Sequence, residues 1–104
     1  MGAPFYNTAR LSGQELQHAI AHAKSQEDAI LLLFTNSYTG RATPSDVMET
    51  LRRRGRAWPI TSVRRAMHNL TKDGSLFKTD HQQAGPYGMP EHIWQLATQP
   101  EKQS

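Results

Sequence analysis

The chain has 104 residues, which is enough for one small domain, and 37% of them are hydrophobic. It contains no cysteine, which excludes disulfides, a thiol nucleophile and cysteine-ligated zinc. Its longest apolar run, residues 29–34, is far shorter than the roughly 18 residues of a membrane span. From these features we expect a soluble cytoplasmic protein with a single core.

The charged residues are unevenly distributed along the chain. The 12 Lys and Arg residues and 9 Asp and Glu residues give a formal net charge of +3. Residues 41–78 contain nine of the bases and three of the acids, so this window carries +6 and the remainder carries -3. Segregation of this kind is typical of a protein that presents one face to a polyanion.

The first predicted element is a helix that follows an irregular start. Residues 1–11 have no hydrophobic periodicity, and we expect them to form a flexible arm. A helix is predicted over residues 12–25, because Ser12 and Glu15 have the spacing of a capping box. Its apolar positions share one side of the helix, and these are Leu16, Ala19, Ile20 and Ala23.

A second helix is predicted over residues 26–37, because Ser25 offers another start before the apolar run. The same pattern also fits one bent helix over residues 12–37. Gly40 then indicates a turn, which we expect to lead into a short strand at residues 41 and 42.

The strongest start signal along the chain is Thr43, which precedes Pro44 and stands three residues before Asp46. Threonine is a good N-cap, and proline suits the first helical position because no backbone N–H is needed there. These residues predict a helix over 44–54 that ends at Gly55 in a left-handed conformation.

The next helix is predicted over residues 61–73, with Thr61 as its cap and Gly74 at its end. Its apolar residues recur at i, i+3, i+4 and i+7, and they are Val63, Ala66, Met67 and Leu70. The opposite side carries hydrogen-bond donors, which are Ser62, Arg64, Arg65, His68, Asn69 and Lys72.

The last predicted element is a hairpin of two strands, residues 76–80 and 92–97. Residues 81–91 between them include two glycines and two prolines, and we expect them to form a long, shaped tip. Residues 98–104 form a polar tail, so the single predicted domain covers residues 12–97.

This order of elements resembles a winged helix-turn-helix domain over about residues 26–97. The likeness is carried by Thr-Pro-Ser-Asp-Val at 43–47, by the segment at 60–74 and by the hairpin at 76–96. The resemblance implies a mainly α fold with a small β-hairpin, in which a three-helix core carries a wing and the N-terminal helix is an addition. It also implies sequence-specific binding of double-stranded DNA, as by a nucleoid-associated transcriptional regulator of a bacterium or phage.

The resemblance further implies which residues touch DNA. A major groove admits one α-helix, and the helix at 61–73 would enter it. Base contacts would come from Ser62, Arg64, Arg65, His68 and Asn69. Phosphate contacts, which position a protein without reading sequence, would come from Thr43, Arg52, Arg53, Arg54, Arg56, Lys72, Gln82, Gln83 and Tyr87. The wing between the strands contains neither Lys nor Arg, so its contacts would be hydrogen bonds.

Two alternatives concern the same helix. Trp94 in the last strand gives a looser likeness to winged helices that bind left-handed DNA, but Arg64 and His68 stand where that subgroup has Asn and Tyr. Alternatively, Arg64 and Arg65 could be surface residues of a winged-helix module that binds protein in a phage replication or recombination assembly. Failure to bind any duplex at low salt would favour this second class of function.

The remaining expectations concern partners and chemistry. The apolar stripe of the N-terminal helix suggests a homodimer formed through that helix. His18 and His22 have metal-ligand spacing with Glu15, but this set lacks a further ligand, so we expect no metal site. No Ser/His/Asp order, phosphate-binding loop or paired-carboxylate motif is present, so we expect no enzyme activity, no cofactor and no small-molecule ligand.

Overall fold

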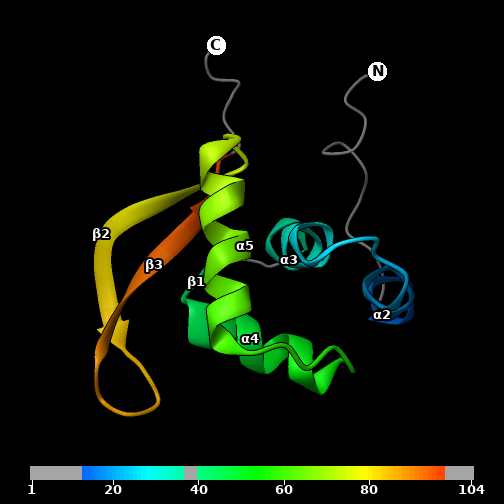
Figure 1. Ribbon diagram of the computed structural model, residues 1–104, viewed down its shortest axis with the longest axis horizontal. Coiled ribbons are helices and arrows are strands. Elements are labelled where there is room, and N and C mark those ends of the chain that lie inside the picture. The colour runs from blue at the N-terminus through cyan, green and yellow to red at the C-terminus, as the bar shows by residue number, and fades with distance from the viewer. Residues whose placement is uncertain (1–12, 37–39, 98–104) are drawn as a thin grey trace.

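The computed structural model describes residues 13–36 and 40–97. Within these ranges it is a small α/β domain with four helices and a three-stranded antiparallel sheet (Figure 1). The helices are α2 (Gly13–Ala21), α3 (Gln26–Thr35), α4 (Pro44–Arg53) and α5 (Ile60–Lys72). The strands are β1 (Arg41–Ala42), β2 (Leu76–Ala84) and β3 (Pro90–Leu96), in the order β1-β3-β2. In Figure 1 the sheet lies on one side of α5, while α3 and α2 lie on the other.

The starts of α3 and α4 follow the predicted caps. The Ser25 side chain accepts a hydrogen bond from the Asp28 amide at 3.1 Å, so α2 and α3 are two helices and not one bent helix. At α4, the Thr43 hydroxyl accepts from the Asp46 amide at 3.1 Å, and the Asp46 carboxylate accepts from the Thr43 amide at 3.2 Å. This reciprocal pair satisfies two backbone donors at the start of the helix.

Several predicted boundaries are wrong. Helix α2 ends at Ala21 and not at residue 25, and the predicted cap Ser12 lies outside the described residues. Helix α5 begins one residue earlier than predicted, because Pro59 has extended backbone angles and takes the N-cap position. Thr61 therefore lies inside the first turn, and the start of α5 has no side-chain cap.

The hairpin is longer and its tip shorter than the sequence predicts. Strand β2 continues to Ala84 and β3 begins at Pro90, so the tip contains residues 85–89 and not 81–91. The polar residues after residue 80 stay in the strand because their backbone pairs with β3 beyond a register shift between Lys78 and Gln82. The short strand β1 pairs with β3 and completes a three-stranded sheet where a hairpin with a short strand before it was expected.

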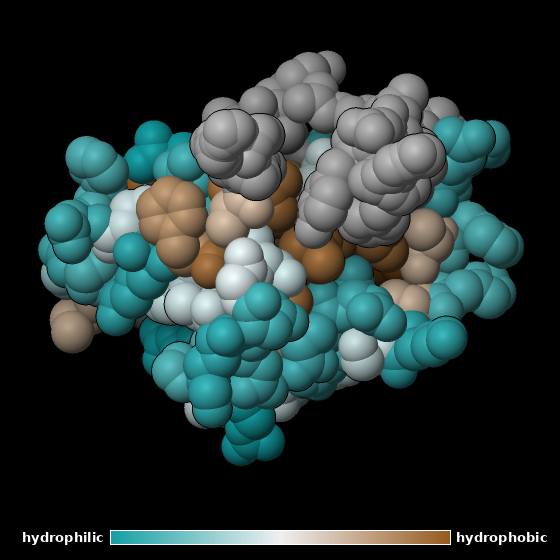
Figure 2. All heavy atoms as spheres, turned by 90° about the horizontal axis from the view of Figure 1, so that it is seen from above, coloured by the Kyte–Doolittle hydropathy of each residue, from teal (hydrophilic) through white to brown (hydrophobic). Residues whose placement is uncertain are grey.

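The core contains side chains from all four described helices and from β2. Its buried hydrophobic members are Leu16, Ile20, Ala29, Ile30, Phe34, Val47, Leu51, Val63, Ala66, Met67, Leu70 and Leu76. Trp58, Trp94 and Met48 are partly buried and pack against this cluster. Seen from above, hydrophobic residues reach the surface near the middle of the molecule, with hydrophilic residues on the left, on the right and below (Figure 2).

The packing of α2 bears on the suggested homodimer. Leu16 is 8% exposed and Ile20 is fully buried, because both pack into the core of their own chain. The two largest residues of the apolar stripe that suggested dimerisation are thus covered within one molecule, whereas Ala19 and Ala23 are half-buried. A homodimer through the N-terminal helix remains a proposal.

None of the described helices combines the length and the apolar composition that crossing a membrane requires.

The capping box predicts a difference between two threonine variants. Thr43 is 1% exposed and caps α4, so Thr43→Ala should lower the free energy of unfolding by about 1 to 2 kcal/mol. Thr61→Ala removes an exposed hydroxyl that caps nothing and should change that free energy by less than about 0.5 kcal/mol. Chemical denaturation of both variants measures the difference, and equal losses would contradict the assignment of the cap.

Candidate nucleic-acid interface

One side of α5 carries a row of basic side chains. Arg64, Arg65, His68 and Lys72 are all exposed, whereas Val63, Ala66, Met67 and Leu70 on the other side are buried. We call these four exposed residues the α5 face. None of their side chains has a hydrogen-bond or ion-pair partner within residues 13–36 and 40–97. The α5 face thus presents three permanent positive charges and one histidine to solvent.

The hairpin adds a further cation beside α5. The Trp94 indole N–H donates a hydrogen bond to the Thr71 hydroxyl of α5 at 3.0 Å. Lys78 is paired with Trp94 across the strands, and its ammonium lies 5.5 Å from the centre of the Trp94 ring. Paired residues share one side of a sheet, so Lys78 lies on the side that meets α5. The sequence alone does not place Lys78 beside α5, because this pairing depends on the strand register.

Asn69 and Ser62, which also lie on α5, differ from the α5 face: one is hydrogen-bonded within the chain and the other is half-buried. The Asn69 side-chain amide donates to the Glu27 carboxylate of α3 at 2.9 Å, so this contact would have to open before Asn69 could reach a base, and its base contact stays a prediction. Asn69 lies near the edge of the exposed side of α5, and its side chain is directed toward α3. Ser62 is half-buried.

Arg56 and Arg54 both bind α2, and their expected role as phosphate contacts stays a prediction. The Arg56 guanidinium donates to the carbonyl oxygens of Ile20 and Ala21, at 2.8 and 3.1 Å, and lies 4.6 Å from the centre of the Trp58 ring. A cation at this position also complements the negative end of the α2 dipole. Arg54 exchanges hydrogen bonds with Gln17 of α2, one through its guanidinium and one through its carbonyl oxygen.

Arg52 and Arg53 remain on the surface but share an acidic neighbour. Both form ion pairs with Glu49, one turn earlier in α4. The hydrogen bond from Arg52 lowers the pKa of the Glu49 carboxyl and raises the pKa of the Arg52 guanidinium. Glu49 thus remains ionised and offsets part of the positive charge at this end of α4.

The start of α4 is occupied by acceptors from the chain itself. Thr43 is buried, and its hydroxyl accepts a hydrogen bond from the Asp46 amide, so its expected contact with a phosphate has no support here and stays a prediction. The Ser45 amide and hydroxyl both donate to the Glu91 carboxylate of β3, and the amide lies 3.1 Å from its acceptor oxygen. A carboxylate already takes the position at which a helix start attracts anions.

The three polar hairpin residues expected to contact phosphate differ in their surroundings. The side-chain amide of Gln82 lies 3.2 Å from the Nε2 atom of His92. Gln83 donates to the Asp46 carboxylate of α4 at 3.2 Å. Tyr87, at the tip, is 93% exposed.

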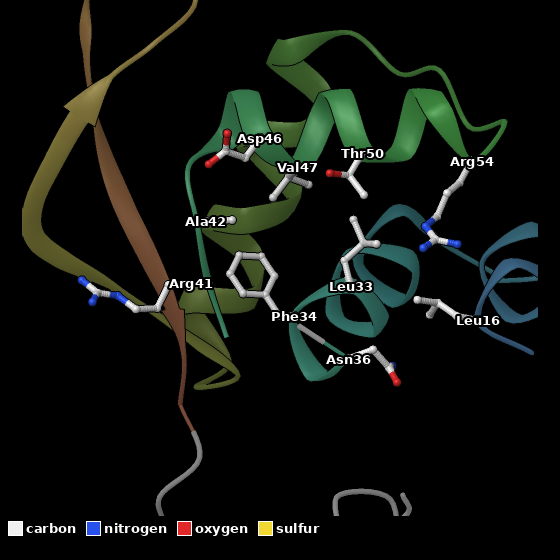
Figure 3. Close-up of a pocket in the computed structure, with 10 residues that line it drawn as sticks. All are labelled: Leu16, Leu33, Phe34, Asn36, Arg41, Ala42, Asp46, Val47, Thr50 and Arg54. Carbon is white, nitrogen blue, oxygen red and sulfur yellow. The ribbon is translucent and has the colours of Figure 1, made fainter. Parts of the chain in front are cut away.

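A hollow of about 290 Å³ lies between α2, α3, β1 and α4 (Figure 3). Leu16, Leu33, Phe34 and Val47 line it, and Arg54 lies at its edge, where it is bonded to Gln17. Figure 3 shows the Arg41 side chain directed away from Phe34 and Val47, so this cation does not face the apolar lining. No residue of α5 lines the hollow, which is therefore separate from the α5 face.

The described residues contain no group of three or more His, Cys, Asp or Glu side chains placed to hold a metal ion. The rings of His18 and His22 stack with their centres 4.2 Å apart. The His22 Nδ1 atom lies 3.1 Å from the His18 carbonyl oxygen.

Comparison with known proteins gives no relative: no protein-family model, curated protein or solved structure matches the chain. A functional proposal therefore rests on the residues of this chain alone.

The contacts of Arg56 separate structural arginines from those of the α5 face. Arg56→Ala should lower the free energy of unfolding by about 2 kcal/mol, because hydrogen bonds from a charged donor to two carbonyl groups are lost. Arg65→Ala, which removes an exposed side chain of equal charge, should change it by less than about 0.5 kcal/mol. Denaturant titration of the two variants tests this, and a stable Arg56→Ala protein would count against the structural role.

Proposed function

We propose that the chain is a winged helix-turn-helix protein that binds double-stranded DNA sequence-specifically, with α5 in the major groove, and acts in transcriptional regulation. The observation that carries this proposal is the α5 face, where four exposed polar side chains have no partner among the described residues. Cations held without a partner on an exposed helix match a negatively charged groove, because no internal ion pair has to be broken first.

The shape of α5 supports the same proposal. Its 13 residues span roughly 20 Å at the usual helical rise of about 1.5 Å per residue. The major groove is wide enough to admit an α-helix. An arginine on such a helix can form two hydrogen bonds with one guanine. The arrangement of α3, α4 and α5 with an adjoining hairpin is also what a winged helix-turn-helix domain requires.

The contacts of each basic residue suggest how the roles are divided. We assign base readout to Arg64, Arg65 and His68, which project from the exposed side of α5. Phosphate contacts are assigned to exposed residues around it, and these are Arg52, Arg53, Lys72, Lys78 and, through its hydroxyl, Tyr87. Arg54, Arg56 and Thr43 support the fold instead, because their polar groups are bonded within the chain.

One observation favours a second candidate, a module that binds protein. Tyr87 and Met89 at the hairpin tip are 93% and 69% exposed, and the tip carries no charged residue. Exposed aromatic and methionine side chains are enriched at protein interfaces. Absence of binding to any duplex at about 50 mM salt would favour this candidate.

The DNA-binding proposal predicts a defined salt dependence. Four phosphate contacts from Arg52, Arg53, Lys72 and Lys78 should give a log-log slope of about -3.6 for the association constant against salt concentration. Arg53→Ala should weaken binding to all duplexes alike and reduce the slope by about 0.9. Fluorescence anisotropy over a salt series measures both quantities, and a slope near zero would rule out binding through these cations.

Base readout by Arg65 predicts a loss of preference and not merely of affinity. Arg65→Ala should relax the preference at one base pair of a duplex selected from a random pool, by about 1 to 3 kcal/mol of discrimination. Arg65→Lys is the matched control, because it keeps the charge but lacks the planar fork of the guanidinium. If the lysine variant keeps the full preference of the original protein, Arg65 acts only as a charge and its assignment to base readout is wrong.

A further inference from the structure

The β2–β3 hairpin is attached to two different helices. Near the start of β2 and the end of β3, Trp94 donates its indole hydrogen bond to Thr71 of α5. Farther toward the tip, the Glu91 carboxylate accepts from the amide and hydroxyl of Ser45, at the start of α4. Gln83, which is paired with Glu91 across the strands, donates to Asp46 of the same helix. We call Glu91, Gln83, Ser45 and Asp46 the Glu91 clamp.

The outer half of the hairpin, between residues 80 and 92, buries few side chains. A register shift between Lys78 and Gln82 separates the two attachments, and a strand bends where its register shifts. Residues 80–84 of β2 are all exposed, and no side chain of β3 is fully buried. Among the described residues, the contacts that join this half to a helix are therefore the polar contacts of the Glu91 clamp.

We propose that Glu91 is a positioning residue: by binding the start of α4 it fixes the direction of the hairpin, so that the hairpin and the α5 face contact one DNA duplex together. This inference rests on the proposed function. Glu91 is unsuited to a phosphate contact, because a carboxylate repels phosphate and because its oxygens already accept from Ser45. Holding the hairpin before DNA arrives removes part of the ordering cost of binding, which is how preorganisation raises affinity.

The test compares variants that separate the contact of Glu91 from its charge. Glu91→Ala and Glu91→Gln both remove the negative charge, but the glutamine amide can still hydrogen-bond to Ser45. Ser45→Ala keeps the charge of Glu91 and removes the hydroxyl that binds it. Hydroxyl-radical footprints of the three variants and of the original protein are recorded on one duplex, selected by the original protein. Hydrogen exchange of the Ser45 amide in free protein reports whether the clamp is broken.

Glu91→Ala should lose the protection that the hairpin gives and should bind roughly threefold to tenfold more weakly than Glu91→Gln, as expected for one or two neutral hydrogen bonds. Glu91→Gln should keep the full footprint, and Ser45→Ala should shorten it in the same direction as Glu91→Ala. The Ser45 amide should exchange faster in Glu91→Ala than in Glu91→Gln.

Equal footprints for Glu91→Ala and Glu91→Gln, whether long or short, would overturn the positioning role while leaving the DNA-binding proposal intact. If Glu91→Ala does not fold, the footprint of Ser45→Ala decides, and full protection there overturns the role. If the original protein binds no duplex, the proposed function fails and the positioning role fails with it.

Discussion

The packing of α5 determines which of its side chains can meet a partner. Val63, Ala66, Met67 and Leu70 are buried against α3, α4 and β2, and burial of one side of a helix leaves the opposite side in solvent. Rotation of α5 about its axis would expose these apolar groups and bury arginines, which is unfavourable on both counts. The direction of the α5 face is thus a result of hydrophobic burial and does not depend on any polar contact of its own.

The start of α4 is the second organising point. Thr43 and Asp46 hydrogen-bond to each other at this start. The Ser45 amide donates to Glu91 of β3, and Gln83 of β2 donates to Asp46. Two carboxylates at the positive end of a helix dipole are mutually tolerated because each accepts hydrogen bonds from neighbouring donors. The start of α4 therefore directly follows the short strand β1 and also binds the hairpin.

Local signals in the sequence predicted most of the elements, whereas tertiary contacts were not predictable from it. The caps at Ser25 and Thr43 act over three residues, so their spacing could be read directly. The partners of Arg54, Arg56 and Asn69 lie 35 to 42 residues away, and no pattern in one sequence indicates such pairs. The strand register is equally hidden: it places Lys78 beside Trp94, and the pairing that continues beyond its shift shortens the tip.

The hairpin has a mechanical consequence for the two helices that it joins. Its base is bonded to α5 through Trp94 and its outer half is bonded to α4 through Glu91 and Gln83. It therefore links α4 and α5 by hydrogen bonds outside the hydrophobic core. A change in the angle between α4 and α5 would therefore strain the hydrogen bonds at one end of the hairpin.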